Sequence, residues 1–168
     1  MAFTATTGND TYTSLFNTTA EVNGLDGTDT LIMNWSAAIG PIRYYSSYGW
    51  GYFTDDVYSS VGFYSFEKFN LTGGSGSDDL RGGDQADTIS GGAGDDSYVY
   101  QPGDGFDTID STDGGSDVIF FTNGITSTRL SYSRDGNDLV ILVDKNTTTG
   151  IRVKDHFINA SKAISYVQ

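Results

Sequence analysis

Aspartates recur at a fixed interval in the middle of this chain, and a pair of glycines precedes each of them. Residues 73–99 divide into three units of nine, GGSGSDDLR, GGDQADTIS and GGAGDDSYV, which fit the pattern G-G-x-G-x-D-x-U-x with U a large apolar residue. The sixth positions are Asp78, Asp87 and Asp96. Carboxylates and turn carbonyls are hard oxygen ligands, which suit calcium better than magnesium or zinc. The spacing therefore predicts repeated calcium sites.

The glycines of each unit predict the turns that would complete these sites. Glycine adopts positive φ at little cost, so a glycine-rich turn can direct backbone carbonyls toward a common point. We therefore expect turn glycines to contribute ligands beside the aspartates, namely Gly74, Gly76, Gly83, Gly92 and Gly94. Gln85 replaces the fourth-position glycine of the middle unit, which should weaken that turn.

The last three residues of each unit read as a short strand with one inward side chain, Leu80, Ile89 or Tyr98. A unit of nine residues cannot bury this side chain alone, so the units must coil and stack, two to a coil. Asp78 and Asp96 are 18 residues apart and should lie above one another on one edge, with Asp87 on the opposite edge. This arrangement is a stack of coils, each with two short strands.

Degenerate units extend the pattern in both directions. Downstream, residues 102–110 and 112–120 keep Asp107 and Asp117, which we include among the candidate calcium ligands. Upstream, residues 5–13 and 24–32 end in the same way, with Asp10 and Asp29 at the acidic position. The upstream segments are either worn coils or simple junctions between a turn and a strand.

The three tandem units resemble the RTX family, the haemolysin-type calcium-binding nonapeptide repeats of bacterial proteins exported by type I secretion. This resemblance implies a parallel β-roll that holds calcium ions between its coils. It also implies a secreted or cell-surface location and a role in secretion or adhesion, or as a module appended to an enzyme. We expect a non-catalytic module that folds when calcium binds outside the cell.

The segment 126–157 alternates apolar and polar residues in short runs separated by turn signals, which predicts a β-meander. A similar segment often follows the repeats as a cap in the RTX family. The predicted fold class is all-β: a short parallel β-roll flanked by antiparallel segments that act as caps. We divide the chain into residues 1–72, the roll at 73–120 and the cap at 121–168, within one continuous unit.

Aromatic residues crowd the segment 42–69 between the upstream units and the clean repeats. One interpretation is a structural lid, because aromatic side chains bury large areas. The other is a ligand platform that stacks on sugar rings of a polysaccharide or cell-surface glycan, with help from Asp55 or Asp56. The candidate platform residues are Tyr44, Tyr45, Tyr48, Trp50, Tyr52 and Tyr58.

Composition argues against several other classes of function. A net charge of -13, with 22 acidic and nine basic residues, makes nucleic acid an improbable partner. The chain has no cysteine and one histidine, His156, so it offers little for zinc or Ser-His-Asp chemistry. No apolar run reaches the roughly 18 residues of a membrane span, and the first ten residues lack a cleaved signal pattern. A small secreted hydrolase that uses Asp55 and Asp56 stays an alternative, although adjacent strand residues point to opposite faces.

Overall fold

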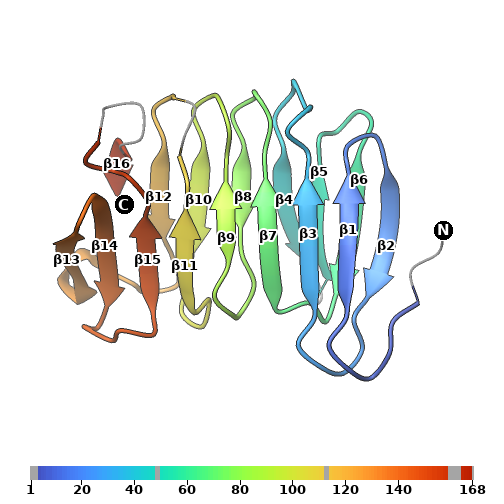
Figure 1. Cartoon of the computed structure of the whole chain (residues 1–168), viewed down its shortest axis with the longest axis horizontal. Helices are drawn as coiled ribbons and strands as arrows, with labels where there is room; N and C mark the ends of the chain where they lie inside the picture. Colours follow the sequence, from blue (N-terminus) through green and yellow to red (C-terminus); the bar gives the residue numbers. More distant parts are fainter. Residues whose placement is uncertain (1–3, 48–49, 112–113, 159–163, 168) are drawn as a thin grey trace.

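The computed structural model describes residues 4–47, 50–111, 114–158 and 164–167 as a stack of short strands in two layers (Figure 1). Within these ranges the helical structure is a single 3-10 turn, η1 (Ser127–Arg129). The prediction of an all-β chain is therefore confirmed. No helix of the described part has the length and apolar character needed to cross a membrane.

The front layer in Figure 1 is one eight-stranded sheet. Its strands, in spatial order, are β1 (Thr11–Leu15), β3 (Thr30–Asn34), β7 (Lys68–Thr72), β9 (Thr88–Ser90), β11 (Phe106–Ile109), β15 (Gly150–Val153), β14 (Asp138–Val143) and β13 (Leu130–Asp135). Neighbours from β1 to β15 pair in parallel, whereas β15, β14 and β13 pair antiparallel. The parallel β-roll and the C-terminal β-meander are both present.

The rear layer consists of two four-stranded sheets that meet where β4 lies beside β8. The first sheet contains β2 (Thr19–Asn23), β6 (Ser60–Tyr64), β5 (Trp50–Thr54) and β4 (Arg43–Ser47). The second contains β8 (Asp79–Arg81), β10 (Ser97–Tyr100), β12 (Val118–Phe121) and β16 (Tyr166–Val167). The backbone N–H of Asp79 donates to the carbonyl of Ile42 at 2.8 Å, which joins the two sheets at this point.

Each coil of the roll consists of one strand in each layer and the turns that join them. Parallel pairing sets Leu80 beside Tyr98 and Tyr98 beside Ile119 in the rear layer. In the front layer the same pairing sets Leu71 beside Ile89 and Ile89 beside Ile109. All of these side chains are buried, so the predicted inward positions of Leu80, Ile89 and Tyr98 are confirmed. The core is thus a set of apolar columns that run along the stack.

The sheet order corrects the predicted place of the aromatic segment. Strands β4, β5 and β6 do not cap an end of the roll, because they lie between β2 and β8 inside the rear layer. In the front layer β3 and β7 are direct neighbours. The chain therefore forms three rear strands, β4, β5 and β6, between two adjacent front strands, whereas an ordinary coil has one. Residues 5–32 form a true coil beyond the aromatic segment, with β1 paired to β3 and β2 paired to β6. Parallel pairing also joins the three predicted segments of the chain. Strand β7 of residues 1–72 pairs with β9 of the roll, and β11 of the roll pairs with β15 of residues 121–168.

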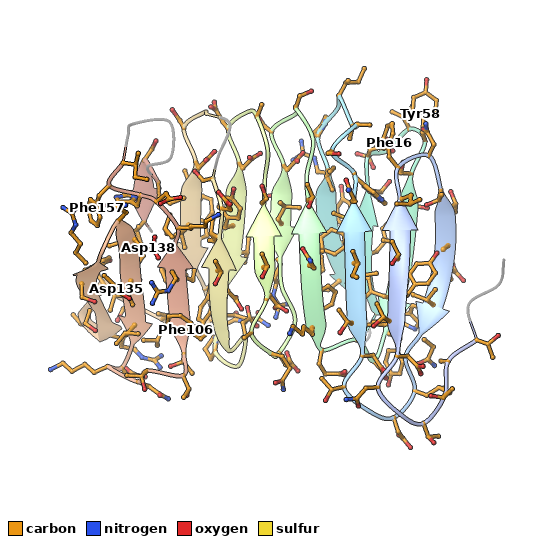
Figure 2. The ribbon with its side chains drawn as sticks, viewed as in Figure 1. Phe16, Tyr58, Phe106, Asp135, Asp138 and Phe157 are labelled. Carbon is orange, nitrogen blue, oxygen red and sulfur yellow. The ribbon has the colours of Figure 1, made fainter. Side chains whose placement is uncertain are left out.

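The C-terminal meander extends the front sheet at the end opposite to the N-terminus (Figure 1). Arg152 on β15 pairs with Asp138 on β14 at 2.8 Å and with Asp135 on β13 at 2.9 Å. Figure 2 shows both aspartates on this end of the molecule. These ion pairs join β13, β14 and β15 through the positive charge of Arg152.

Removing a column side chain tests the apolar core. Ile119 is 0% exposed, and Ile119→Ala should lower the free energy of unfolding by about 2–5 kcal/mol because it leaves a cavity between coils. The matched control is Ile39→Ala, since Ile39 is 85% exposed and its loss should change stability by about 0.5 kcal/mol or less. Urea unfolding followed by circular dichroism measures both. Equal losses in the two variants would contradict the core assignment.

Candidate metal centre

One edge of the roll carries a column of buried aspartates, Asp78, Asp96 and Asp117, each at most 2% exposed. The backbone N–H of Asp78 donates to Oδ1 of Asp96 at 2.9 Å, and that of Asp96 donates to Oδ1 of Asp117 at 3.0 Å. Asp78 itself accepts the backbone N–H of Ile42 at 2.7 Å. Each carboxylate therefore bonds to the backbone of the adjacent coil, and the 18-residue spacing stacks Asp96 on Asp78 as predicted.

The opposite edge carries a second column, Asp29, Asp87 and Asp107, each at most 3% exposed. Oδ1 of Asp87 accepts the N–H of Phe69 at 2.6 Å, and Oδ1 of Asp107 accepts the N–H of Asp87 at 3.1 Å. Oδ1 of Asp29 accepts the N–H of Asp10 at 2.7 Å. The sequence left open whether the unit that contains Asp29 is a coil or a simple junction between a turn and a strand. The hydrogen bond shows that Asp29 occupies the same position in its coil as Asp87.

The first glycine of each unit leaves room for the second carboxylate oxygen. A Cβ added to Gly73, Gly82 or Gly91 would lie 2.0–2.3 Å from Oδ2 of the aspartate five residues later. We call this space the glycine cradle. A Cβ on Gly24 would likewise lie 2.3 Å from Oδ2 of Asp29. Glycine is required here because any side chain would occupy the place of the carboxylate.

The later glycines of the units allow neighbouring turns to stack closely. A Cβ on Gly92 would lie 2.1 Å from the carbonyl oxygen of Gly74, and one on Gly94 would lie 2.4 Å from that of Gly76. Gly92 and Gly94 also have positive φ, +95° and +110°. Gly74, Gly76 and Gly83 have no positive φ, so close approach rather than left-handed backbone explains those glycines. The backbone of one turn therefore lies directly against a carbonyl oxygen of the adjacent turn.

Gln85 fits its turn because the neighbouring coil makes room for it. The turn that contains Gly105 lies against the backbone of Gln85, because a Cβ on Gly105 would lie 2.8 Å from the carbonyl carbon of Gln85. At this contact the residue without a side chain is Gly105, so Gln85 can keep its own side chain. The backbone N–H of Gln85 donates to the carbonyl of Glu67 at 3.1 Å. The middle turn is thus bonded to the preceding coil despite the missing glycine.

Burial makes the ionised form unfavourable for four of the column aspartates, Asp78, Asp87, Asp96 and Asp107. It raises the pKa of Asp78 to about 6 and that of Asp87 to about 7, although backbone N–H bonds oppose the rise in both. Burial together with the charges of Asp78 and Asp117 raises the pKa of Asp96 to about 8. Burial and the charge of Asp87 raise the pKa of Asp107 to about 9. At neutral pH Asp96 and Asp107 therefore favour a proton or another positive charge.

The donor set matches calcium rather than a transition metal. Oδ2 of Asp29 and Oδ2 of Asp96 are buried and have no hydrogen-bond partner, so each has capacity for a cation. Within the described ranges no three acidic, histidine or cysteine side chains gather as a metal-binding group. Additional ligands would have to come from the stacked turn carbonyls, and calcium accepts such all-oxygen sets. That the predicted aspartates and glycines are ligands stays a prediction.

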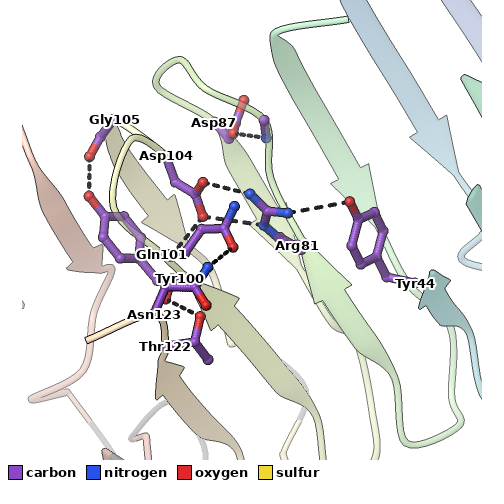
Figure 3. A network of polar contacts seen from close by, with 10 residues as sticks. Tyr44, Arg81, Asp87, Tyr100, Gln101, Asp104, Gly105, Thr122 and Asn123 are labelled. Atoms are coloured by element: carbon purple, nitrogen blue, oxygen red, sulfur yellow. Dashed lines mark hydrogen bonds and ion pairs between the residues drawn. The ribbon is translucent and has the colours of Figure 1, made fainter. Parts of the chain in front are cut away.

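Arg81 forms an ion pair with a buried carboxylate, that of Asp104, which the sequence did not predict (Figure 3). Arg81, whose side chain is 14% exposed, pairs with the buried Asp104 at 2.8 Å. Its guanidinium also donates to the hydroxyl of Tyr44 at 3.4 Å. Asp104 is the third residue of the degenerate unit 102–110, off the sixth position, and this is why the repeat pattern did not single it out. A charged acid between two glycines was the available signal.

The candidate platform residues occupy different environments. Tyr45, Trp50, Tyr52 and Tyr58 are 38–67% exposed, whereas Tyr44 is half-buried and packs on Phe53 with ring centroids 5.2 Å apart. Tyr48 lies outside the described residues. The segment thus serves as core on its inner face and as exposed surface on its outer face.

Asp55 and Asp56 also differ in how far their side chains are exposed. Asp55 is 5% exposed, and its Oδ1 accepts the backbone N–H groups of residues 57, 58 and 59 at 2.8–3.1 Å. Burial would raise the pKa of Asp55, but these hydrogen bonds outweigh it and lower the pKa. Asp56 is exposed. Asp55 therefore organises the loop between β5 and β6 as an ionised acceptor.

No family model matches the chain. Over 66 residues it is 38% identical to the iron-regulated protein FrpA of Neisseria meningitidis serogroup C, a match that covers 38% of this chain and 6% of FrpA. The crystal structure of the extracellular lipase LipA from Serratia marcescens aligns with 88% of this chain and 36% of LipA, with a TM-score of 0.36 and 12% identity. The chain thus spans a small part of FrpA and about a third of LipA.

A methyl group in the glycine cradle should disable the candidate site. Gly91→Ala places a Cβ 2.0 Å from Oδ2 of Asp96, so we expect at least a tenfold weaker response of folding to calcium. Gly40→Ala is the matched control, because a Cβ there meets nothing within 4 Å. Circular dichroism during calcium titration measures both variants. A normal titration of Gly91→Ala would refute the cradle as part of the site.

The raised pKa values predict how the cation-free protein responds to pH. Protons stabilise the folded state below the unfolded pKa of about 4, and this stability is lost as pH rises through the folded pKa values of about 6 to 9. The folded fraction of protein stripped of divalent cations, measured by circular dichroism, should therefore fall from pH 5 to pH 9. Saturating calcium should reduce the fall. A folded fraction that rises with pH in cation-free buffer would contradict the buried columns.

Proposed function

We propose that this chain is a calcium-binding β-roll module of the RTX family, belongs to a secreted or cell-surface bacterial protein, and has no catalytic role of its own. One observation carries the proposal: the coils bury an aspartate at each edge, and Oδ2 of Asp29, Asp78, Asp87 and Asp96 lies in a glycine cradle. Carboxylate and carbonyl oxygens are the ligands that calcium takes from protein. The sequence match to part of FrpA accords with a bacterial source.

The mechanism is folding coupled to cation binding. Backbone N–H groups of one coil hold Oδ1 of the next aspartate, as between Asp78 and Asp96, and this orients Oδ2 toward the turn. Without a cation, ionised carboxylates in these columns repel one another and oppose closure of the stack. Bound calcium supplies the positive charge that neutralises them. Since only the stacked coils bring the oxygens together, binding energy becomes folding energy.

This coupling suits a protein that is exported before it folds. Where calcium is scarce, the net charge of -13 and the acidic columns keep the chain loose. Outside the cell, calcium reaches the concentrations to which extracellular modules respond, about 10⁻⁴–10⁻³ M. The folded module then serves as a scaffold for secretion or adhesion.

The hydrolase alternative has less support. Asp55 is buried, and its Oδ1 accepts three backbone N–H groups, so its carboxylate is committed to the loop and cannot reach a substrate without unfolding it. A general acid also needs a raised pKa, whereas that of Asp55 is lowered. The exposed aromatic surface instead favours binding as the second candidate function.

Far-UV circular dichroism of cation-free protein during calcium titration tests the proposal. We expect a cooperative gain of β-structure with calcium, a much smaller gain with magnesium, and reversal on addition of EDTA. Analysis of tightly held metal in the starting sample is the control. A β-structure that is unchanged in metal-free protein would refute the coupling.

An isosteric substitution separates charge from hydrogen bonding. Asp96→Asn keeps an acceptor for the N–H of Asp78 but removes a buried charge, so the cation-free chain should become more stable. Calcium affinity should fall by about tenfold or more, because a hard anionic ligand is lost. The control is Asp79→Asn, since the side chain of Asp79 is 45% exposed and pairs with Arg43. Isothermal titration calorimetry and thermal melts measure the two effects, and equal affinity losses would contradict the assigned roles.

A further inference from the structure

The outer face of the sheet β2-β6-β5-β4 carries aromatic side chains that the calcium proposal does not use. Cross-strand pairing sets Tyr45 on β4 opposite Tyr52 on β5, and Trp50 and Tyr64 lie further along the same face. These four side chains are 38–51% exposed. Trp50 and Tyr64 lie with ring centroids 5.7 Å apart at 33°. Four exposed aromatic rings on one sheet face indicate a binding surface.

The position of Tyr52 makes its ring available for stacking. Tyr52 is paired with Gly62 on β6, and a Cβ on Gly62 would lie 3.5 Å from Cδ2 of Tyr52 and from Cγ of Glu21. Gly62 is buried although its strand position faces outward, because Tyr52 and Glu21 cover it. The Tyr52 ring therefore lies over the sheet and exposes the opposite side of the ring, an arrangement in which an aromatic residue shields a strand glycine.

Polar groups surround this ring in a shallow hollow. The hollow has a volume of about 450 Å³ and is lined in part by Tyr45, Tyr52, Tyr58, Asp56 and Ser60. Tyr58 extends from the loop between β5 and β6 at the edge of the molecule (Figure 2). Aromatic rings thus alternate with hydroxyl and carboxylate groups, whereas the centre of a protein–protein interface is a more continuous apolar surface.

We propose that this hollow binds a neutral saccharide chain. A sugar ring presents C–H bonds on one face, which suit the negative face of an aromatic ring, and hydroxyls at its edge, which suit Asp56 and the tyrosine and serine hydroxyls. Acidic glycans are excluded because Glu21 and Asp56 are exposed at the site and the chain carries a net charge of -13. Arg43 at the far edge of the sheet is already paired with Asp79. Trp50 and Tyr64 extend the platform along the strands, so a chain of several sugars fits better than a single one.

A glycan array with neutral and acidic glycans, probed with the calcium-saturated protein, tests this proposal. We expect neutral oligosaccharides to be retained and acidic ones such as alginate to be rejected. The best neutral hexasaccharide is then titrated calorimetrically against variants. Retention of acidic glycans alone, or of none, would overturn the proposal, and a protein ligand at this face would replace it.

Two variants and a matched control locate the site. Tyr52→Ala should weaken binding by about tenfold or more, the loss typical of an aromatic hot spot. Gly62→Val keeps every tyrosine but displaces the Tyr52 ring, so it should weaken binding similarly without disturbing the strand backbone. Tyr132→Ala is the control, since Tyr132 is 53% exposed on the distant β13. Calcium-induced folding of each variant is checked first, and unchanged binding in both Tyr52→Ala and Gly62→Val would refute the site.

Discussion

The bond from the backbone of one coil to a buried carboxylate of the next is the interaction on which this structure depends. In each column the backbone N–H of one aspartate, or of the residue at the matching position of a neighbouring strand, donates to Oδ1 of the next aspartate. A slip of one residue would break the bond and also turn every inward apolar side chain to the outside. The carboxylate columns and the apolar columns therefore enforce the same register.

This interaction also creates the molecule's main electrostatic cost. The carboxylates that hold the coils together are buried close to one another, so the ionised forms of Asp96 and Asp107 are unfavourable without a positive charge. Beside the second column the chain supplies a cation of its own, because Arg81 pairs with the buried Asp104 and its charge also opposes the rise that burial causes in the pKa of Asp107 (Figure 3). The ion pair also fixes Tyr44, which connects the clean repeats to the aromatic insertion. Elsewhere in the columns calcium is the proposed counter-charge.

The aromatic insertion adds a surface without interrupting the stack. Strands β3 and β7 pair directly in the front layer, so the coils continue while β4 and β5 widen the rear layer. Gly51 permits this packing, because a Cβ there would lie 2.2 Å from the Phe63 ring in the core. On the other face Gly62 supports Tyr52. The two glycines separate a structural inner face from an exposed outer face, which is the face proposed to bind a ligand.

The nine-residue period was sufficient to predict the parallel coils, the stacking of Asp96 on Asp78 and the inward Leu80, Ile89 and Tyr98, and the alternation in residues 126–157 predicted the C-terminal meander. These features depend on local spacing, and a strict repeat leaves one register that buries its apolar residues. The place of residues 42–69 and the ion pair between Arg81 and Asp104 depend on contacts between segments distant in the chain, which no local period specifies. The equivalence of Asp29 with Asp87 likewise emerged only from strand pairing, because a worn unit and a simple turn have the same residues until a neighbouring coil bonds to one of them.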